Sequence, residues 1–326
     1  MVQLITIVGG AGFVGRYVVQ ELAKRECRLR VVVRDVHRAA RLKPLGGVGQ
    51  VALVGGDVRD AALIDAACDG ADAVINLVGI LAEGGGAGFD NVHVAGARTV
   101  AAAAAKAGAA ALVHVSAIGA DAASDSAYGR SKGEGEAAVR AAFPGATILR
   151  PSILFGPEDQ FINRFAALAR GLPFFLPVIA PNTRFQPAYV LDVAKAIAMA
   201  ATAPADFAGK TYELGGPKAW SMRELLAWIV AETYADKPLV EVPAALASRM
   251  ASLTGWLPGA PLTRDQWLML QRDNVVAAGA LGFEAFGIAP VPLEAIAPAY
   301  LVRYRKQGRF NPGTAATAGA PDQQLL

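Results

Sequence analysis

Tyr128 and Lys132 are separated by three residues in the sequence Tyr128-Gly-Arg-Ser-Lys132, and Ser116 lies 12 residues before the tyrosine. On a helix this spacing places both side chains on one face. A free phenol has a pKa near ~10, and an adjacent ammonium favours the phenolate, so Tyr128 could exchange a proton with a substrate hydroxyl. Ser116, Tyr128 and Lys132 are therefore candidate catalytic residues, with the serine as oxyanion donor. The alternative is an ordinary amphipathic helix.

A second chemical feature stands near the start of the chain, where an apolar run at 4–8 leads into a glycine-rich turn. Glycine permits a tight turn, close approach of a pyrophosphate, and close packing of helix on strand. The free N–H groups of a helix that begins after such a turn face the phosphates. This order predicts a dinucleotide-binding turn rather than an ordinary loop, with these residues at the cofactor: Gly9, Gly12, Phe13, Val14 and Gly15.

The nature of the dinucleotide depends on the charges that follow the second predicted strand. Arg34 comes directly after this strand, and Arg16 and Arg38 can reach the same corner. Cations suit a 2′-phosphate, because charge-assisted hydrogen bonds are strong, so NADP(H) is the preferred cofactor. Asp35 keeps NAD(H) as the alternative, since an inward carboxylate would accept from a ribose hydroxyl. Asp57 is placed to meet the adenine amino group, or else is a solvated turn residue.

Strands and helices alternate through the first 150 residues and must position these groups. Strands are predicted at 4–8, 29–33, 50–54, 73–78, 111–115 and 146–149, and helices at 14–24, 94–106 and 128–142. Such alternation is typical of right-handed βαβ units and a parallel sheet. Ser116 then lies at the carboxyl edge of the sheet, where ligands bind. The predicted fold class is α/β, a Rossmann-type doubly wound parallel sheet with a smaller C-terminal lobe.

The domain organisation is expected to follow this change of pattern. Residues 1–151 are predicted to form the dinucleotide-binding domain, and 188–216 to return to it through a helix at 192–203 and a strand at 211–214. Residues 152–305 are predicted to form the smaller lobe, and 306–326 a flexible tail. Prolines at 173, 177 and 181 interrupt an apolar segment that includes Phe174 and Phe175. This segment is either the wall of a substrate pocket or a docking surface.

Composition excludes several classes of function. The chain has 31 basic and 28 acidic residues, a net charge of +3, and no basic stripe interleaved with aromatics, which argues against nucleic-acid binding. Its two cysteines, Cys27 and Cys68, are not clustered, so we expect a reducing compartment and no metal site. No segment is a good spanning helix, and a core strand near Met1 leaves no room for a signal peptide. A cytoplasmic location is expected.

Several short strings resemble the short-chain dehydrogenase/reductase superfamily in its extended and atypical branches. Within it, the chain is most similar to the family of NADPH-binding 39 kDa accessory subunits of respiratory complex I and their bacterial relatives. The strings common to the superfamily include Asn76-Leu77-Val78-Gly79, Tyr128-x-x-x-Lys132 and Arg150-Pro151-Ser152. The strings specific to the family include Gly12-Phe13-Val14-Gly15-Arg16-Tyr17, Phe155-Gly156-Pro157-Glu158-Asp159-Gln160-Phe161-Ile162-Asn163 and Leu262-Thr263-Arg264-Asp265-Gln266.

The resemblance implies a tightly held NADPH with a structural role, beside a membrane-bound redox assembly, and no established turnover. Complex I subunits or another membrane-associated protein are then the expected partners, with peripheral association at the inner face of the cytoplasmic membrane. The basic string at 303–306 could meet anionic lipid, although a solvated helix end is preferred. The predicted cofactor site further includes Asp57, Tyr128 and Lys132, the lysine at the nicotinamide ribose, together with Val58, Val78, Gly79 and Pro151.

Departures from the enzyme pattern leave other functions open. Val8 stands where extended members carry threonine, Ser116-Ala117 where they often carry paired serines, and His93 where many carry asparagine. We interpret His93 as a hydrogen-bonding residue at a helix start. One alternative function is an active NAD(P)-dependent oxidoreductase or epimerase acting on a hydroxyl or carbonyl group. Another is an accessory role in quinone biosynthesis.

Overall fold

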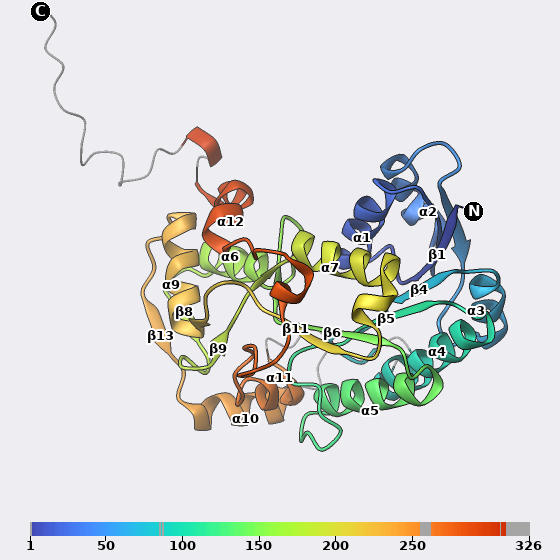
Figure 1. Cartoon of the computed structure of the whole chain (residues 1–326). Helices are drawn as coiled ribbons and strands as arrows, with labels where there is room; N and C mark the ends of the chain where they lie inside the picture. Colours follow the sequence, from blue (N-terminus) through green and yellow to red (C-terminus); the bar gives the residue numbers. More distant parts are fainter. Residues whose placement is uncertain (1, 85, 87, 255–261, 307, 311–326) are drawn as a thin grey trace, which may run out of the picture.

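A parallel seven-stranded sheet forms the centre of the computed structural model, which describes residues 2–84, 86, 88–254, 262–306 and 308–310 (Figure 1). Its strand order is β11-β6-β5-β4-β1-β2-β3, and every neighbouring pair is parallel. This confirms the predicted Rossmann-type fold. The strands are β1 (Gln3–Val8), β2 (Cys27–Val33), β3 (Val51–Gly55), β4 (Ala73–Asn76), β5 (Ala111–Val115), β6 (Thr147–Pro151) and β11 (Thr211–Leu214).

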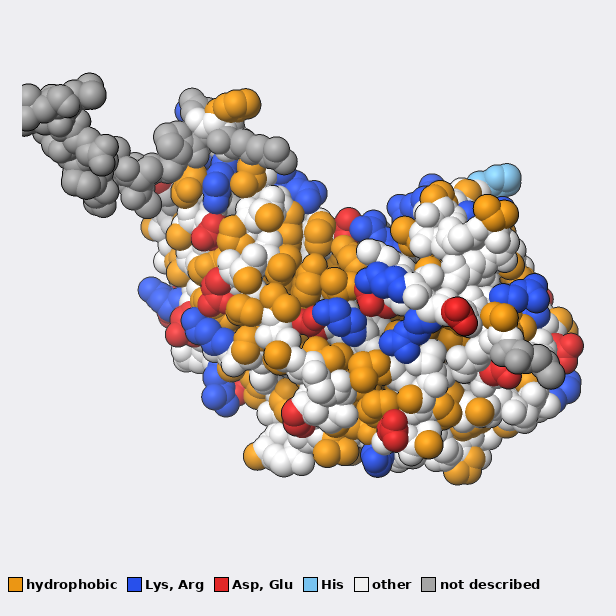
Figure 2. Space-filling model, turned by 45° about the horizontal axis from the view of Figure 1, so that its top comes forward, with side chains coloured by type: hydrophobic (Ala, Val, Ile, Leu, Met, Phe, Trp, Pro, Cys, Tyr) orange, Lys and Arg blue, Asp and Glu red, His pale blue; other side chains and the backbone are white. Residues whose placement is uncertain are grey.

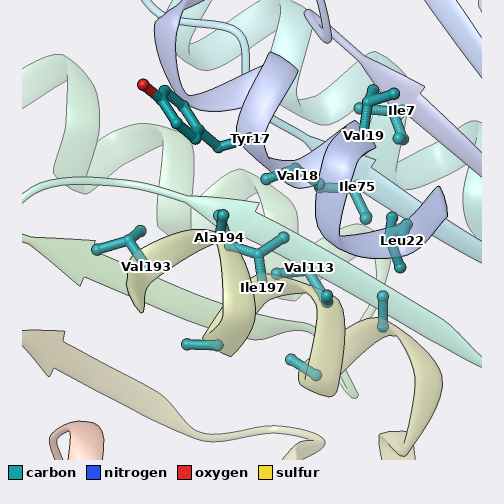
Figure 3. Close-up of a cluster of buried hydrophobic side chains, with 14 of the residues drawn as sticks. Ile7, Tyr17, Val18, Val19, Leu22, Ile75, Val113, Val193, Ala194 and Ile197 are labelled. Carbon is teal, nitrogen blue, oxygen red and sulfur yellow. The ribbon is translucent and has the colours of Figure 1, made fainter. Parts of the chain in front are cut away.

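Helices cover both faces of the sheet. One face carries α1 (Phe13–Ala23) and α7 (Val190–Thr202), and the other carries α3 (Ala61–Cys68), α4 (Gly96–Lys106) and α5 (Ala127–Ala142) (Figure 1). Successive strand residues point to opposite faces, so Ile7 packs toward α1 and α7 while Val8 joins the core on the α3–α4 side. Figure 3 shows Val18 and Leu22 of α1 facing Ile197 of α7 in the first of these cores.

The first half of the chain departs from the expected elements at several places. Helix α3 has no counterpart among the predicted helices, β2 begins at Cys27 rather than at 29, and β6 ends at Pro151 rather than at 149. Strand β4 ends at Asn76 rather than at 78, because the Asn76 side chain accepts the N–H of Val78 at 3.1 Å and turns the chain out of the sheet. The helix expected from 94 begins earlier, as a π-helical segment η2 (Asp90–Ala95) that continues into α4. His93 therefore lies inside a helical segment, not at a helix start. The remaining short elements here are α2 (Val36–Ala39) and η1 (Ala40–Leu45).

A separate hydrophobic core lies beyond β6, under residues of the C-terminal half. We call the elements around it the C-terminal lobe. The strand pairs β7–β10 and β8–β13 are parallel, and β9–β12 is antiparallel. Its elements are β7 (Leu154–Phe155), α6 (Ile162–Gly171), β8 (Leu176–Val178), β9 (Arg184–Phe185), β10 (Ala188–Tyr189), β12 (Trp220–Ser221), α9 (Met222–Thr233), β13 (Leu239–Glu241), α10 (Ala244–Thr254), α11 (Arg264–Met269), α12 (Leu293–Leu301), η4 (Val302–Tyr304) and η5 (Gly308–Phe310). Two short segments pack instead on the core of the sheet: α8 (Pro204–Phe207), which leads into β11, and η3 (Phe283–Phe286).

Asp159 joins the start of α6 to α12 inside this lobe. Its buried carboxylate accepts the N–H groups of Gly156, Phe161 and Asn163, and the Tyr300 hydroxyl donates to it at 3.0 Å. Burial raises the pKa of Asp159, although these donors oppose the rise. The string from Phe155 to Asn163 therefore has a structural role, because its Asp159 holds the start of α6 against α12.

The surface features expected in the C-terminal half have mixed outcomes. Phe174 and Phe175 precede β8 with 79% and 45% of their surface exposed, so they do not line the interior of the lobe. Arg303 donates to two backbone carbonyls and Arg305 pairs with Glu232, so this basic string is bound largely to the protein itself. Of the predicted tail at 306–326, residues 307 and 311–326 lie outside the described residues.

The face over α1, α7 and α12 is indented between the sheet and the C-terminal lobe. Figure 2 shows Lys and Arg side chains gathered near the middle of this face. Over the part of the chain that the structure describes, no helix is both long enough and apolar enough to cross a bilayer.

Candidate functional site

Each glycine of the first turn meets a different structural demand. Gly9 has a φ of +87°, which favours glycine. A Cβ on Gly10 would lie 2.4 Å from the Val31 side chain, and one on Gly15 would lie 2.5 Å from the backbone of Gly10. A Cβ on Gly12, in contrast, would meet only the Gly9 carbonyl oxygen, at 3.4 Å. Gly10 and Gly15 are needed for packing, whereas Gly12 leaves space beside the backbone.

The N-terminus of α1 opens onto that space. Gly12 is its N-cap in an extended conformation, and no side chain caps the helix. Among the described residues, none accepts a hydrogen bond from the N–H groups of Phe13, Val14 or Gly15. Unpaired donors at a helix N-terminus, with the positive end of its dipole, suit a phosphate. The turn therefore presents donors and room to one anionic group.

The carboxylate of Asp35 does not face this turn. It caps α2 by accepting the N–H of Arg38 at 3.0 Å, and it pairs with the Arg38 side chain at 3.4 Å. The bond from the Arg38 N–H holds the pKa of Asp35 below its usual value. Arg34 is exposed and has no ion-pair partner in the described residues. The Arg34 guanidinium can therefore bind a ligand phosphate at this corner, whereas the Asp35 carboxylate is already bonded to the start of α2.

Arg16 and Asp57 are held by protein partners. The Arg16 guanidinium lies 2.5 Å from a carboxylate oxygen of Glu158, and the Tyr17 hydroxyl donates to the other oxygen at 2.8 Å. Asp57 accepts from Arg59 through both carboxylate oxygens, at 2.8 and 3.0 Å, and this arginine lowers the pKa of Asp57. The structure therefore gives Arg16 an ion-pair partner in Glu158 and gives Asp57 an intramolecular partner in the turn.

Arg41 is a residue that sequence reasoning missed. It lies on η1, and its guanidinium donates to the Ala11 carbonyl in the glycine turn at a long 3.5 Å. Its position after α2 carries no strand-end signal, and only the fold of η1 over the turn makes the contact. The sequence shows basic residues between 34 and 41, but it does not indicate that Arg41 is the one that contacts the turn.

Lys132 is a buried cation beside the end of β4. Its ammonium donates to the Val115 carbonyl at 3.2 Å, and a Cβ on Gly79 would lie 3.4 Å from the same nitrogen. Burial lowers the pKa of Lys132 to about 8, while the Glu136 carboxylate on the next turn opposes this. Two of its three N–H donors have no acceptor in the described structure, so the ammonium can serve a further oxygen.

Ser116 follows the Val115 carbonyl that accepts from this cation, and Tyr128 lies one turn before Lys132 on α5, but in the described residues neither side chain is hydrogen-bonded to Lys132 or to the other. The Tyr128 ring makes edge contacts with Phe89 and His93, and its hydroxyl has no hydrogen-bond partner among the described residues. Burial and the Asp265 carboxylate raise the pKa of Tyr128 to about 12. The buried Ser116 hydroxyl is also without a partner within the described structure. The three candidate catalytic residues therefore form no connected proton relay by themselves.

His93 holds the loop after β4 against α5. Its Nε2 accepts the N–H of Ile80 at 3.0 Å, so Nδ1 carries the proton and donates to the Ser131 hydroxyl at 2.9 Å. Burial and the nearby Lys132 ammonium lower the pKa of His93 to about 3, which keeps it neutral. The interpretation of His93 as a hydrogen-bonding residue is thus correct in kind, although its place is not a helix start.

His114 is a second buried histidine below the site. Asn76 donates its side-chain amide to His114 Nδ1 at 3.1 Å, because its oxygen is already used by Val78. The ring proton then lies on Nε2, which has no acceptor in the described residues. Burial, with a contribution from Lys132, lowers the pKa of His114 to about 3.

A dinucleotide fits what these residues offer. Gly12 leaves space where a side chain would block a phosphate, the α1 amides supply donors, and the orphaned Ser116 hydroxyl and the underused Lys132 ammonium need acceptors. Val78 packs against Gly9, Val58 against Gly96, and Pro151 ends β6, all at the carboxyl edge of the sheet. Ligands bind at that edge in open α/β sheets.

Comparison with known proteins agrees with this site. Residues 5–215 match the NAD dependent epimerase/dehydratase family. The chain is 35% identical, over 92% of its length and 80% of the relative, to "NADH dehydrogenase [ubiquinone] 1 alpha subcomplex subunit 9, mitochondrial" of Rattus norvegicus. It is 37% identical to "Ceramide reductase" of Caulobacter vibrioides, over 59% of this chain and 58% of that protein.

A solved structure supports the fold alone. The NADPH-dependent quinone oxidoreductase of Escherichia coli, solved with NADPH, has a TM-score of 0.72 and 22% identity, covering 91% of this chain and 99% of that one. The resemblance to the complex I accessory subunits is confirmed by the relatives and extends through the C-terminal lobe. Because the family match spans most of the chain and includes the whole glycine turn, the protein is a member of the NAD dependent epimerase/dehydratase family.

Proposed function

We propose that this protein binds NADP(H) and acts as an accessory subunit of respiratory complex I, in which the dinucleotide stabilises the fold. The observation that carries the proposal is the 35% identity over 92% of the chain to a relative whose name assigns it to that complex. A shared dinucleotide fold alone would explain similarity over the sheet. It would not explain similarity that continues through the C-terminal lobe, which we take as the docking part, built mainly from 152–305.

The chain supplies residues for each part of the cofactor. The α1 amides and Gly12 are assigned to the pyrophosphate, Arg34 and Arg41 to the 2′-phosphate, and Lys132 to the nicotinamide ribose. The bound dinucleotide would supply hydride chemistry, whereas the residues of this chain bind and orient it. NADP(H) is favoured over NAD(H) because Asp35 is used as a helix cap, whereas exposed Arg34 has no hydrogen bond or ion pair within the described residues and only a longer-range attraction to Asp57.

A structural role is favoured by the state of Tyr128. Its hydroxyl has no hydrogen bond to Ser116 or Lys132 among the described residues, so these three groups form no proton relay. Retention of the nucleotide still has an energetic benefit, because a ligand at 100 times its Kd adds roughly 2.7 kcal/mol of stability.

The proposal is tested on native membranes from the source cells, solubilised gently and separated on a native gel. We expect the protein to migrate with complex I, and the nucleotide released on denaturation to carry the 2′-phosphate by mass spectrometry. Tyr128→Phe should leave both results unchanged, since the phenol has no hydrogen bond to lose in the fold. Migration only as a free protein without nucleotide would contradict the proposal.

An active reductase or epimerase is the second candidate, because the chain is 37% identical to a ceramide reductase over 59% of its length and carries the pair Tyr128 and Lys132. A substrate screen that follows nicotinamide absorbance separates the two functions. Turnover that Tyr128→Phe abolishes would favour the enzyme. Turnover that survives the substitution would remove Tyr128 from the mechanism.

Arg34 and Arg16 are expected to contribute differently to NADPH binding. Arg34→Ala should weaken NADPH binding about tenfold and leave NADH binding unchanged, because one charge-assisted bond to the 2′-phosphate, roughly 1.5 kcal/mol, is lost. Arg16→Ala should change both affinities less than threefold, since Arg16 is paired with Glu158. Titration calorimetry with both nucleotides measures this, and a larger NADPH loss in Arg16→Ala would reverse the assignment.

A further inference from the structure

Asp265 is a residue of the C-terminal lobe that binds the helix carrying Tyr128 and Lys132. Its carboxylate accepts the N–H of Ala127 at 2.6 Å and that of Tyr128 at 3.3 Å, and the Ser126 hydroxyl donates to it at 3.1 Å. These partners are 137 to 139 residues away in the chain. The contact is therefore long-range and joins α11 to the first turn of α5.

The first turn of α5 depends on such a partner. Its N–H groups have no intrahelical acceptor, and the Ser126 cap satisfies only the N–H of Gly129, at 3.2 Å. Asp265 accepts the N–H groups of Ala127 and Tyr128, the first two residues of the helix. A carboxylate is also favoured at the positive end of the helix dipole. The orientation of Tyr128 is thus set partly by a residue from another lobe.

Asp265 is held firmly on its own side. It lies in the first turn of α11, where Thr263 and Gln266 form a capping box with both hydrogen bonds at 3.1 Å. In the described part of the chain, no cation pairs with Asp265, and its hydrogen bonds all go to the start of α5. The carboxylate is therefore committed to one contact, and this accounts for the family string from Leu262 to Gln266.

We propose that Asp265 is a positioning residue for the dinucleotide. By holding the start of α5, it places Tyr128 and Lys132 where they meet the nicotinamide half of the cofactor. Binding of this half and ordering of α11 therefore stabilise each other. The inference rests on the proposed dinucleotide site. The coupling is reciprocal by thermodynamic necessity. It distinguishes the two halves of the cofactor, since the glycine turn and Arg34 have no contact with Asp265.

The test compares NADPH with adenosine 2′,5′-bisphosphate, which lacks the nicotinamide half. Asp265→Asn keeps the side-chain shape and removes the charge. We expect it to weaken NADPH binding about fivefold to tenfold and to leave the affinity for the bisphosphate within twofold. The control is Glu241→Gln, which removes an exposed carboxylate of the same lobe that pairs with Arg223; it should change neither affinity.

Hydrogen exchange on the wild-type protein gives a second measurement that does not depend on the variant folding. NADPH should slow exchange in α11, whereas the bisphosphate should slow it only around the glycine turn. Equal losses of both ligands in Asp265→Asn, or no change in α11 on NADPH binding, would overturn the inference. If wild-type protein binds neither ligand, the proposed function fails instead.

Discussion

Replacing Gly12 with alanine should remove dinucleotide binding and leave the fold intact. A Cβ at this position meets no protein atom closer than 3.4 Å, and its φ of −71° with ψ of 179° is ordinary for alanine. The methyl group would occupy the space in front of the α1 amides. Loss of charge-assisted bonds worth roughly 3 kcal/mol predicts a Kd for NADPH about 100-fold higher.

Two glycine variants provide the controls. Gly171→Ala changes a glycine with open space around it at the end of α6, and it should alter neither stability nor affinity. Gly15→Ala should destabilise the fold, since its Cβ would lie 2.5 Å from the Gly10 backbone. Thermal unfolding and NADPH titration on the same samples separate the two effects. If Gly12→Ala binds NADPH as tightly as the wild-type protein, the assignment of the pyrophosphate to this turn is wrong.

Replacing Lys132 with methionine should stabilise the protein without nucleotide and weaken NADPH binding. Burial depresses the pKa of Lys132 from 10.5 to about 8, and each unit corresponds to about 1.4 kcal/mol, so a charged Lys132 costs on the order of 3 kcal/mol of folding stability at neutral pH. Methionine of similar shape removes this cost. It also removes a donor to the ribose, which predicts a Kd about 10-fold to 100-fold higher.

The pH dependence of stability follows with a defined sign. Because Lys132 binds its proton more weakly in the folded chain, the unfolded chain holds more protons between about pH 8 and 10.5. The contribution of Lys132 to stability therefore rises with pH across this window and is fully unfavourable below about pH 8. Lys132→Met should flatten this rise.

Denaturant unfolding of the nucleotide-free protein at pH 7, 8 and 9.5 measures both effects. Lys106→Met is a suitable control, because its ammonium is exposed and its ion pair with Asp65 lies at the surface, where such pairs contribute little to stability. A Lys132→Met variant that is less stable than wild type at pH 7 would mean that the hydrogen bond to Val115 outweighs the cost of burying the charge.

The local features of the fold could be predicted from the sequence because they depend on neighbours in the chain. The run of apolar residues at 4–8 followed by Gly9 and Gly12 predicts a buried strand, a turn and a helix, and these form as expected. Strand β11, at 211–214, was also predicted, since a short alternating pattern is sufficient. The π-helical start at 90–95 is not predicted, and the His93 side chain within it bonds to Ile80 and Ser131, contacts that no local pattern indicates.

The side-chain partners could not be predicted in the same way. Arg16, Asp35 and Asp57 were all placed near a nucleotide by their position after strands or in the turn, but each has a protein partner: Glu158, the α2 N-terminus and Arg59. Two of these partners, the α2 N-terminus and Arg59, are neighbours in the sequence. The third, Glu158, is 142 residues away, and only the folded chain brings it to α1.

The sequence by itself determined the Rossmann architecture, the glycine turn and the family, because strand periodicity and backbone conformation are local properties of residue type. The tertiary structure alone decided which charges are free to bind a ligand and which are used within the fold. Arg41 contacts the turn, Arg16 is paired with Glu158, and Asp265 holds the helix of Tyr128 from another lobe. Such pairings depend on the direction of side chains across long sequence separations, and no local pattern encodes that direction.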